Sequence, residues 1–249
     1  MPPQLYQNLV LVWIGLAAAT FVLLLFVSAP YGRHARQGWG PLIPARLGWV
    51  LMEAASPCVL LAFFLAGTAK GLASVVLLSL WELHYLHRSF IYPFQLSNPK
   101  PMPVSVVAMG AAFNFVNATL NGYWLFFLAD YPASWLADPR FLAGVLLFAA
   151  GFAVNRWSDA ILRRLRKPGE TGYKIPRGGP WELVSSPNYL GEIIEWCGFA
   201  LASWSLAGLA FAAWTLANLA PRARTNHQWY RAQFKDYPAE RKALLPFAW

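Results

Sequence analysis

Four carboxylates stand in stretches of this 249-residue chain that are otherwise strongly apolar: Glu53, Glu82, Glu192 and Glu195. If these stretches lie in a bilayer, an ionised carboxylate there is costly and needs a charged partner, a water-filled cavity or a bound proton. Such an acid can orient a substrate or move a proton during a reaction. The sequence therefore indicates that at least one of the four has a function.

A second group of reactive side chains lies around residue 85. Within seven residues the chain carries an acid, two imidazoles, a phenol and a guanidinium: Glu82, His84, Tyr85, His87 and Arg88. Glu53 lies in the preceding apolar stretch, so the two stretches could share a polar pocket. Glu82, His87 and Arg88 could instead form an interfacial cluster near a helix end. For Glu53 and Tyr85 we favour a functional role.

The most polar and basic segment of the chain runs from residue 155 to residue 196, between two apolar stretches. Its basic side chains are crowded together: Arg163, Arg164, Arg166, Lys167, Lys174 and Arg177. Asp159, Arg163 and Arg166 recur at helical spacing and continue a polar stripe from Asn155. Such a segment at the mouth of a membrane protein suggests an anionic ligand. A solvated helix with internal ion pairs is the alternative.

A helix is expected to begin near Ser185 and to carry the last two acids. Glu192 and Glu195 are three residues apart, and Asn188 lies one turn before Glu192, so the three share a polar face. Ser185 and its neighbours provide capping groups for the helix start, where backbone N–H groups attract phosphate.

The elements that must position these residues are long apolar helices. Hydrophobic residues make up 57% of the chain and charged residues 12%, which is typical of a polytopic membrane protein. We predict an all-α protein with seven spans near residues 8–29, 47–66, 71–92, 104–129, 139–157, 189–204 and 206–226. The last two spans could form a tight hairpin or one bent helix. We expect a single membrane domain over 1–249.

The basic residues predict the orientation of this domain. Of the 20 Lys and Arg residues, only Lys70 and Arg140 fall on one side of the seven-span topology. Because basic loops stay in the cytoplasm, the N-terminus is expected outside and the C-terminus inside. A cytoplasmic loop at about 156–188 and a tail at about 227–249 follow. The net charge of +9 is then an asymmetric surface near anionic lipid, not a nucleic-acid signature.

Several familiar chemistries lack their motifs in this sequence. There is no GxGxxG after a strand, no GxxxxGK[ST], no GxSxG and no HExxH. The four histidines are too few for a membrane di-iron site, and we expect no metal. A bulky anionic cofactor that meets a lipid-soluble substrate fits what remains.

Five stretches of the chain resemble the steroid 5-alpha-reductase family of NADPH-dependent membrane enzymes. They are ARLGWVLME, LHYLHRSFIYP, ILRRLRKPGETGYKIPRGG, SPNYLGEIIEW and KDYPAERKALLPF, which are spread from residue 45 to residue 247, so the resemblance extends over most of the chain. The resemblance implies a seven-helix fold that encloses NADPH and substrate. It also implies reduction of the delta-4 double bond of a 3-oxo steroid to the 5-alpha product.

The resemblance also assigns roles to residues of this chain. Glu53 and Tyr85 match the acid and the tyrosine that bind the 3-oxo group, with Tyr85 as electrophile or proton donor. Met52 departs from the glutamine that commonly precedes the acid, and Asn226 stands where a histidine would be expected. The matched cofactor-binding residues are Asn155, Asp159, Arg166, Tyr173, Asn188, Glu192, Trp196, Arg222, Asn226 and Tyr230.

Other functions stay open at this point. The substrate could be another lipid enone, a sterol or an enoyl-CoA, and a membrane methyltransferase that binds S-adenosylmethionine is a further alternative. A proton-coupled lipid carrier is the alternative from outside the enzymes. We expect a monomer surrounded by membrane lipid, in a bacterial inner membrane or the endoplasmic reticulum.

Overall fold

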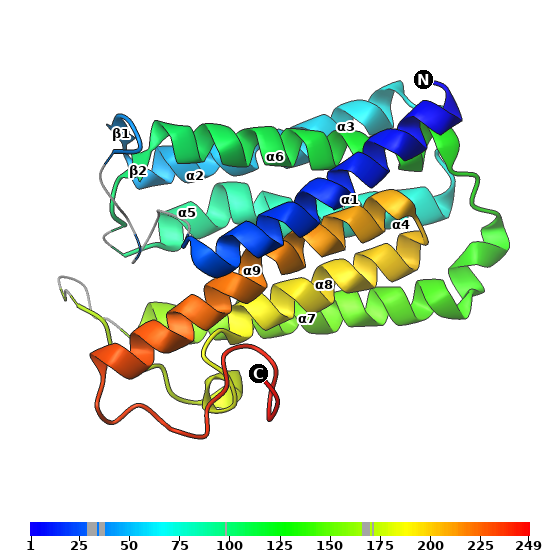
Figure 1. Ribbon diagram of the computed structural model, residues 1–249. Coiled ribbons are helices and arrows are strands. Elements are labelled where there is room, and N and C mark those ends of the chain that lie inside the picture. Colours follow the sequence, from blue (N-terminus) through cyan, green and yellow to red (C-terminus); the bar gives the residue numbers. More distant parts are fainter. Residues whose placement is uncertain (29–33, 35–37, 98, 166–169, 171) are drawn as a thin grey trace.

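The computed structural model describes residues 1–28, 34, 38–97, 99–165, 170 and 172–249. The chain is mostly helical, and its long helices lie side by side along one direction (Figure 1). The helices are α1 (Pro3–Phe26), α2 (Ala45–Glu53), α3 (Ala55–Ala66), α4 (Leu72–Leu86), α5 (Tyr92–Gln95), α6 (Val104–Tyr123), α7 (Pro139–Arg164), α8 (Pro187–Ser203) and α9 (Leu206–Gln233).

Four helical stretches within the described residues are long and apolar enough to cross a membrane: Pro3–Phe26, Ala45–Ala66, Val104–Leu128 and Pro139–Arg164. This confirms a mostly helical protein with four candidate membrane spans. The expected spans near 71–92, 189–204 and 206–226 are also helical, as α4, α8 and α9. That these three cross the membrane stays a prediction.

The second apolar stretch is interrupted at the residue that carries its acid. α2 ends at Glu53, and α3 begins at Ala55. Pro57 has no N–H to donate to the carbonyl of Glu53 four residues earlier, which weakens a continuous helix at this point. The interruption leaves the side chain of Glu53 buried at the junction of α2 and α3.

α4 continues into a π-helical turn, His87–Ile91, before the short helix α5. Pro93 cannot donate to the carbonyl of Ser89, so the regular α-helical ladder is not available there. Near the same end of the bundle, β1 (Leu42–Ile43) pairs antiparallel with β2 (Met102–Pro103). These features fix the end of α4 close to the start of α2 and α6.

α7 and α8 pack along almost their full length because glycines remove side chains from their interface. An added Cβ on Gly151 would lie 2.3 Å from the backbone nitrogen of Glu195. An added Cβ on Gly191 would lie 2.5 Å from the backbone nitrogen of Asn155. The close approach brings the polar ends of the two helices together.

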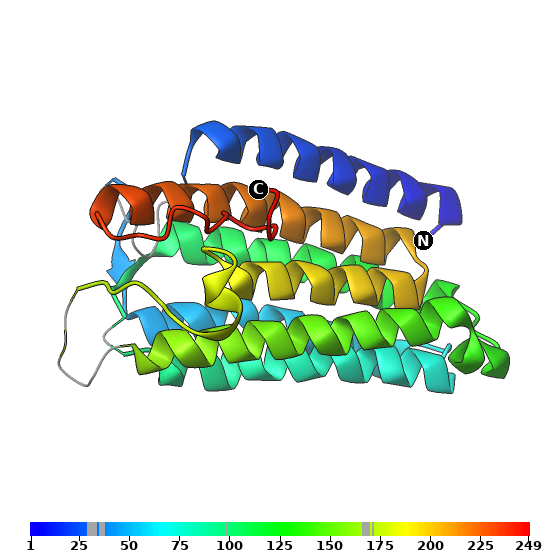
Figure 2. The same cartoon turned by 90° about the horizontal axis from the view of Figure 1, so that it is seen from below.

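α8 and α9 form a tight hairpin, which resolves the choice left by the sequence. Trp204 adopts a left-handed conformation with φ 43°, and the side chain of Ser205 accepts a hydrogen bond from the Gly208 N–H. α1 then packs against α9 on the outside of the bundle (Figure 2).

Candidate active site

Tyr85 and Glu53 are joined by a third side chain, Asn114 of α6. The Tyr85 hydroxyl donates to Asn114 Oδ1 at 3.1 Å, and Asn114 Nδ2 donates to Glu53 Oε2 at 3.2 Å. The same Nδ2 donates to the carbonyl of Met52 at 2.8 Å. Helices α2, α4 and α6 therefore meet in one polar group. That this group lines a substrate pocket stays a prediction.

Arg88 places a cation beside this group. Its Nε lies 3.7 Å from Glu53 Oε1. Its guanidinium stacks over Trp49 and over Tyr92, at 4.8 Å and 4.6 Å from the ring centroids. Arg88 therefore belongs to the same polar group as Glu53. Glu82 does not join this group: its buried Oε1 has no hydrogen-bond partner among the described residues.

Aromatic rings surround Tyr85 and exclude water from it. Tyr85 is 3% exposed, and its ring centroid lies 5.2 Å from that of Trp81 and 5.7 Å from that of Trp196. Trp196, which the sequence assigned to the cofactor, therefore packs beside Tyr85. Beside it, His84 Nδ1 lies 2.8 Å from Glu195 Oε1, in a fully buried pair.

A second polar group lies between α7 and α8. Asn155 Nδ2 donates to the carbonyl of Asn188 at 3.0 Å and approaches Glu192 Oε2 at 3.4 Å. Asn188 Nδ2 donates to Asp159 Oδ1 at 3.1 Å. The structure therefore brings together Asn155, Asp159, Asn188 and Glu192. Glu195, by contrast, points to α4, so the two acids of α8 have different neighbours.

The predicted residues of α9 lie beside the start of α8. Arg222 Nε donates to the Tyr189 hydroxyl at 3.0 Å, and Asn226 Nδ2 lies 3.5 Å from Ser186 Oγ. His34, from the loop after α1, lies 3.2 Å from Asn226 Oδ1. Arg222 and Asn226 thus contact the first turn of α8, whose Asn188 belongs to the α7–α8 group.

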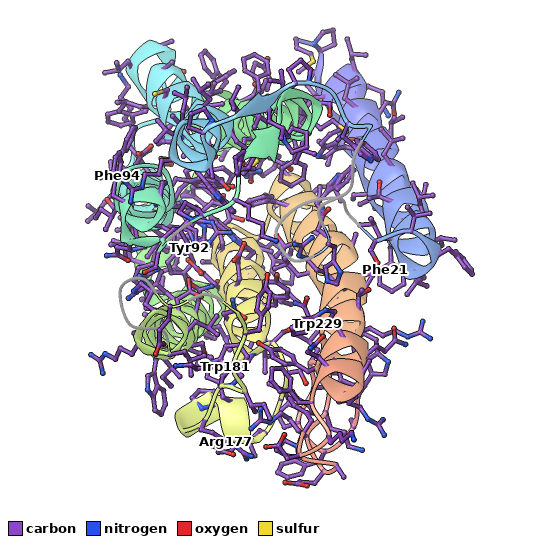
Figure 3. All side chains as sticks on the ribbon, turned by 90° about the vertical axis from the view of Figure 1, so that its left-hand side faces the viewer. Phe21, Tyr92, Phe94, Arg177, Trp181 and Trp229 are labelled. Carbon is purple, nitrogen blue, oxygen red and sulfur yellow. The ribbon has the colours of Figure 1, made fainter. Side chains whose placement is uncertain are left out.

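The two predicted tyrosines contact aromatic rings outside the α7–α8 group. Tyr173 packs against Trp229 with ring centroids 4.8 Å apart, and Tyr230 stacks on Tyr237 of the tail at 5.2 Å. Figure 3 views this end of the bundle and shows Tyr92 and Trp229 on opposite sides of α8. Arg166 lies outside the described residues, so the structure gives no position for its side chain.

The loop before α8 is fastened to the C-terminal tail. Arg241 is buried and donates to the carbonyl of Pro176 at 3.2 Å and to Glu182 Oε2 at 3.3 Å. The Gly178 N–H also donates to Glu182, and this bond, together with Arg241, lowers the pKa of Glu182 below its usual value. The contacts hold the loop in place next to the polar group of α7 and α8.

The donors at this end fit a phosphate-bearing cofactor. Among the described residues, His87 Nε2 and Arg163 Nη1 are buried polar atoms without a hydrogen-bond partner. The positive charges of Arg156 and Arg163 act on His87 as well, so the surroundings of these donors are positively charged. An anionic group would satisfy such donors. The described residues contain no group of three or more His, Cys, Asp and Glu side chains that could hold a metal ion.

Sequence reasoning missed Asn114 and treated Arg88 as part of a possible interfacial cluster. A signal for Asn114 was present, because Asn114, Asn117 and Asn121 recur at helical spacing within an apolar span. Polar residues inside a span usually face the interior of a bundle. Only the pairing of α6 with α2 and α4 shows which of the three reaches Tyr85.

Long apolar helices around a buried acid and phenol are typical of helical membrane proteins with a functional site between their helices. A family model described as 3-oxo-5-alpha-steroid 4-dehydrogenase matches residues 100–249. The chain is 44% identical over 238 residues to 3-oxo-5-alpha-steroid 4-dehydrogenase 1 of Bos taurus, covering 94% of this chain and 93% of that protein.

Two further relatives extend the comparison. The chain is 44% identical over 253 residues to 3-oxo-5-alpha-steroid 4-dehydrogenase 2 of Homo sapiens, covering 99% of each chain. It is 44% identical over 241 residues to steroid 5-alpha-reductase DET2 of Gossypium hirsutum, covering 93% of each. The chain therefore belongs to the 3-oxo-5-alpha-steroid 4-dehydrogenase family, and it is an oxidoreductase that acts on a CH–CH group. This confirms the resemblance found in the sequence.

Proposed function

We propose that the protein reduces the delta-4 double bond of 3-oxo steroids to 5-alpha-3-oxo steroids with NADPH. The observation that carries the proposal is the buried group of Tyr85, Asn114 and Glu53, enclosed by aromatic rings. The names of the relatives support a steroid with a 3-oxo group as the substrate. Product formation from such a steroid is the first test.

In this proposal Tyr85 and Glu53 form the site that receives the 3-oxo group. Reduction adds hydride at C5, and the electrons of the double bond move through C4 onto the ketone oxygen. A hydroxyl donor already placed at that oxygen stabilises the enolate that develops. Tyr85 is this donor, while Glu53 holds it in position, and a proton from solvent then completes C4. The apolar rings around Tyr85 strengthen its interaction with the oxygen by excluding water.

The cofactor would lie over the α7–α8 group and reach inward toward Tyr85. When bound, the reduced nicotinamide supplies the hydride. Asn188 and Arg222 would hold phosphate, and Glu192 would accept from the carboxamide and so orient the ring. His87 and Arg163 offer further donors to the anionic part of the cofactor. The remaining proposed contacts come from Asn155, Asp159, Arg166, Tyr173, Trp196, Asn226 and Tyr230.

We further propose the membrane arrangement that the sequence predicts. Seven helices would enclose the cofactor and the substrate, with the N-terminus outside and the C-terminus in the cytoplasm. NADPH would then enter from the end that carries the 172–186 loop and the tail. The steroid would enter from the surrounding lipid, and the protein would act as a monomer.

The test is an assay of the purified protein with testosterone or progesterone and NADPH. We expect the saturated 5-alpha product, with deuterium at C5 when the NADPH carries deuterium at the transferred position. NADPH should also raise the melting temperature, because a ligand stabilises the state that it binds.

The alternatives give different results in the same assays. Turnover of an enoyl-CoA or another lipid enone, but of no 3-oxo-delta-4 steroid, would change the proposed substrate. Thermal stabilisation by S-adenosylmethionine and not by NADPH would contradict a reductase. Inactivity of a protein that still binds NADPH, over a panel of enones, would contradict the proposed reaction.

A further inference from the structure

Among the described residues, Asn114 is the only side chain that forms hydrogen bonds with both Tyr85 and Glu53. It is 3% exposed and reaches from α6 to α4 and to α2. A buried amide satisfied on both ends is held in one orientation, because losing either bond would leave a polar atom without a partner. Asn114 is therefore a rigid link between the two residues to which we assign the ketone.

The chemistry of its neighbours fixes which way the amide points. The carbonyl of Met52 and the carboxylate of Glu53 can only accept, so the NH₂ group of Asn114 must face them. Its carbonyl oxygen consequently faces Tyr85. The hydroxyl of Tyr85 must then donate to Asn114, and the direction of its O–H bond is defined before any substrate arrives.

We propose that Asn114 is a positioning residue that holds the hydroxyl of Tyr85 ready for the ketone; this rests on the function proposed above. On binding, the ketone oxygen joins Asn114 Oδ1 as an acceptor of the Tyr85 O–H, so Asn114 keeps its partner. The Glu53 carboxylate stays held by Asn114 Nδ2. An amide does not titrate near neutral pH, so Glu53 acts on Tyr85 through geometry and not by exchanging a proton through Asn114.

The chain offers a matched control on the same helix. Asn117 is also an asparagine of α6 and is 1% exposed. Its Oδ1 accepts from Trp13 Nε1 at 3.0 Å, and its Nδ2 donates to the carbonyl of Phe113 at 2.8 Å. It therefore fastens α6 to α1 and has no contact with Tyr85 or Glu53 in these bonds.

The experiment is a double-mutant cycle between Asn114→Leu and Tyr85→Phe, with Asn117→Leu as the control. We expect Asn114→Leu to lower kcat at least about tenfold, the scale of one misplaced reacting group, with the Kd for NADPH changed less than about twofold. The double variant should be less than about threefold slower than Tyr85→Phe alone, because coupled residues are not additive. Asn117→Leu should leave kcat within about threefold of the wild type and should combine additively with Tyr85→Phe.

The outcomes separate this proposal from the proposed function. A wild-type protein without steroid reductase activity would contradict the function itself. If the wild type is active, equal kcat values for wild type and Asn114→Leu, or independent effects of Asn114→Leu and Tyr85→Phe, would overturn the role of Asn114. Should Asn114→Leu fail to fold, the isosteric Asn114→Asp decides. The aspartate keeps an acceptor for Tyr85, but its second carboxylate oxygen replaces the NH₂ group and repels the oxygens of Glu53 and of the Met52 carbonyl. A wild-type kcat in this variant would overturn the proposal.

Discussion

Replacing Gly151 by alanine adds a methyl group at a place where the backbones of α7 and α8 nearly touch. The new Cβ would lie 2.3 Å from the nitrogen of Glu195 and 2.5 Å from the carbonyl oxygen of Gly191. Both neighbours are backbone atoms, so no side chain can rotate away. The helices must separate to accept the methyl group.

The Cβ distances give the smallest separation of the two helices, and from it the expected change in stability follows. Contacts of Cβ shorter than 3.0 Å are essentially never found, so the helices must move apart by at least 0.7 Å (3.0 minus 2.3). Overpacking of this kind lowers the free energy of unfolding by about 1–3 kcal/mol, and the higher helix propensity of alanine raises it by about 1 kcal/mol. We therefore expect a net loss of about 1 kcal/mol of stability.

The same movement should weaken cofactor binding. The bond from Asn155 to the carbonyl of Asn188 and the bond from Asn188 to Asp159 are 3.0 Å and 3.1 Å long, so 0.7 Å of separation takes both beyond 3.5 Å. If each aligned group contributes about 1 kcal/mol to NADPH binding, losing both raises the Kd about 30-fold.

Thermal unfolding in detergent and titration with NADPH measure the two effects. Gly15→Ala is the control, because its Cβ would meet nothing within 4 Å and it also lies in a helix, α1. We expect Gly15→Ala to leave the melting temperature and the Kd for NADPH unchanged or slightly improved. Wild-type stability and a wild-type Kd in Gly151→Ala would refute the argument that close packing of α7 and α8 forms the cofactor site.

Three further predictions follow from the other contacts. Tyr85→Phe should lower kcat by about 10²–10³, the usual cost of one donor to a developing oxyanion, while the Kd for NADPH measured by titration stays unchanged; normal turnover would remove Tyr85 from the reaction. Asn188→Ala should raise that Kd about tenfold with a smaller effect on kcat, and the opposite pattern would reverse the role assigned to it.

The third prediction concerns pH and the carboxylate of Glu182. Because its folded pKa lies below the unfolded value of about 4.3, its contribution to stability is present above that value and is lost as the pH falls through the folded pKa. Glu182→Gln should therefore melt at a lower temperature than wild type at pH 7, with the difference shrinking on acidification; a constant difference between pH 7 and pH 3 would contradict this.

The helical class of the fold could be predicted from the sequence because apolar stretches of spanning length are a strong signal. The ends and breaks of the helices were harder. The predicted span 47–66 is divided at Ala54, and α7 continues to Arg164, past the predicted end at residue 157. Both differences arise locally, from Pro57 in one case and from a polar but helix-forming segment in the other.

In the site, too, the sequence predicted which residues share a helix face but not which helices come into contact. Helical spacing alone placed Asn155 with Asp159, and Asn188 with Glu192, on single faces. It could not show that the two faces meet, because that depends on glycines in both helices. It also placed Glu192 and Glu195 on one face, although they contact Asn155 and His84 respectively. A separation of three residues turns two side chains far enough apart to reach different helices.

Because its two acids face different helices, α8 lies between the group that we assign to the cofactor and the group around Tyr85. Glu192 faces α7 and the group that we assign to the cofactor. Glu195 holds His84, which directly precedes Tyr85 on α4, and Trp196 lies against the Tyr85 ring. A shift of α8 caused by cofactor binding would therefore move the groups that pack on Tyr85. Since α8 is also fixed to α7 by close backbone contact, its packing against α4 connects the group that we assign to the cofactor with the group that we assign to the ketone.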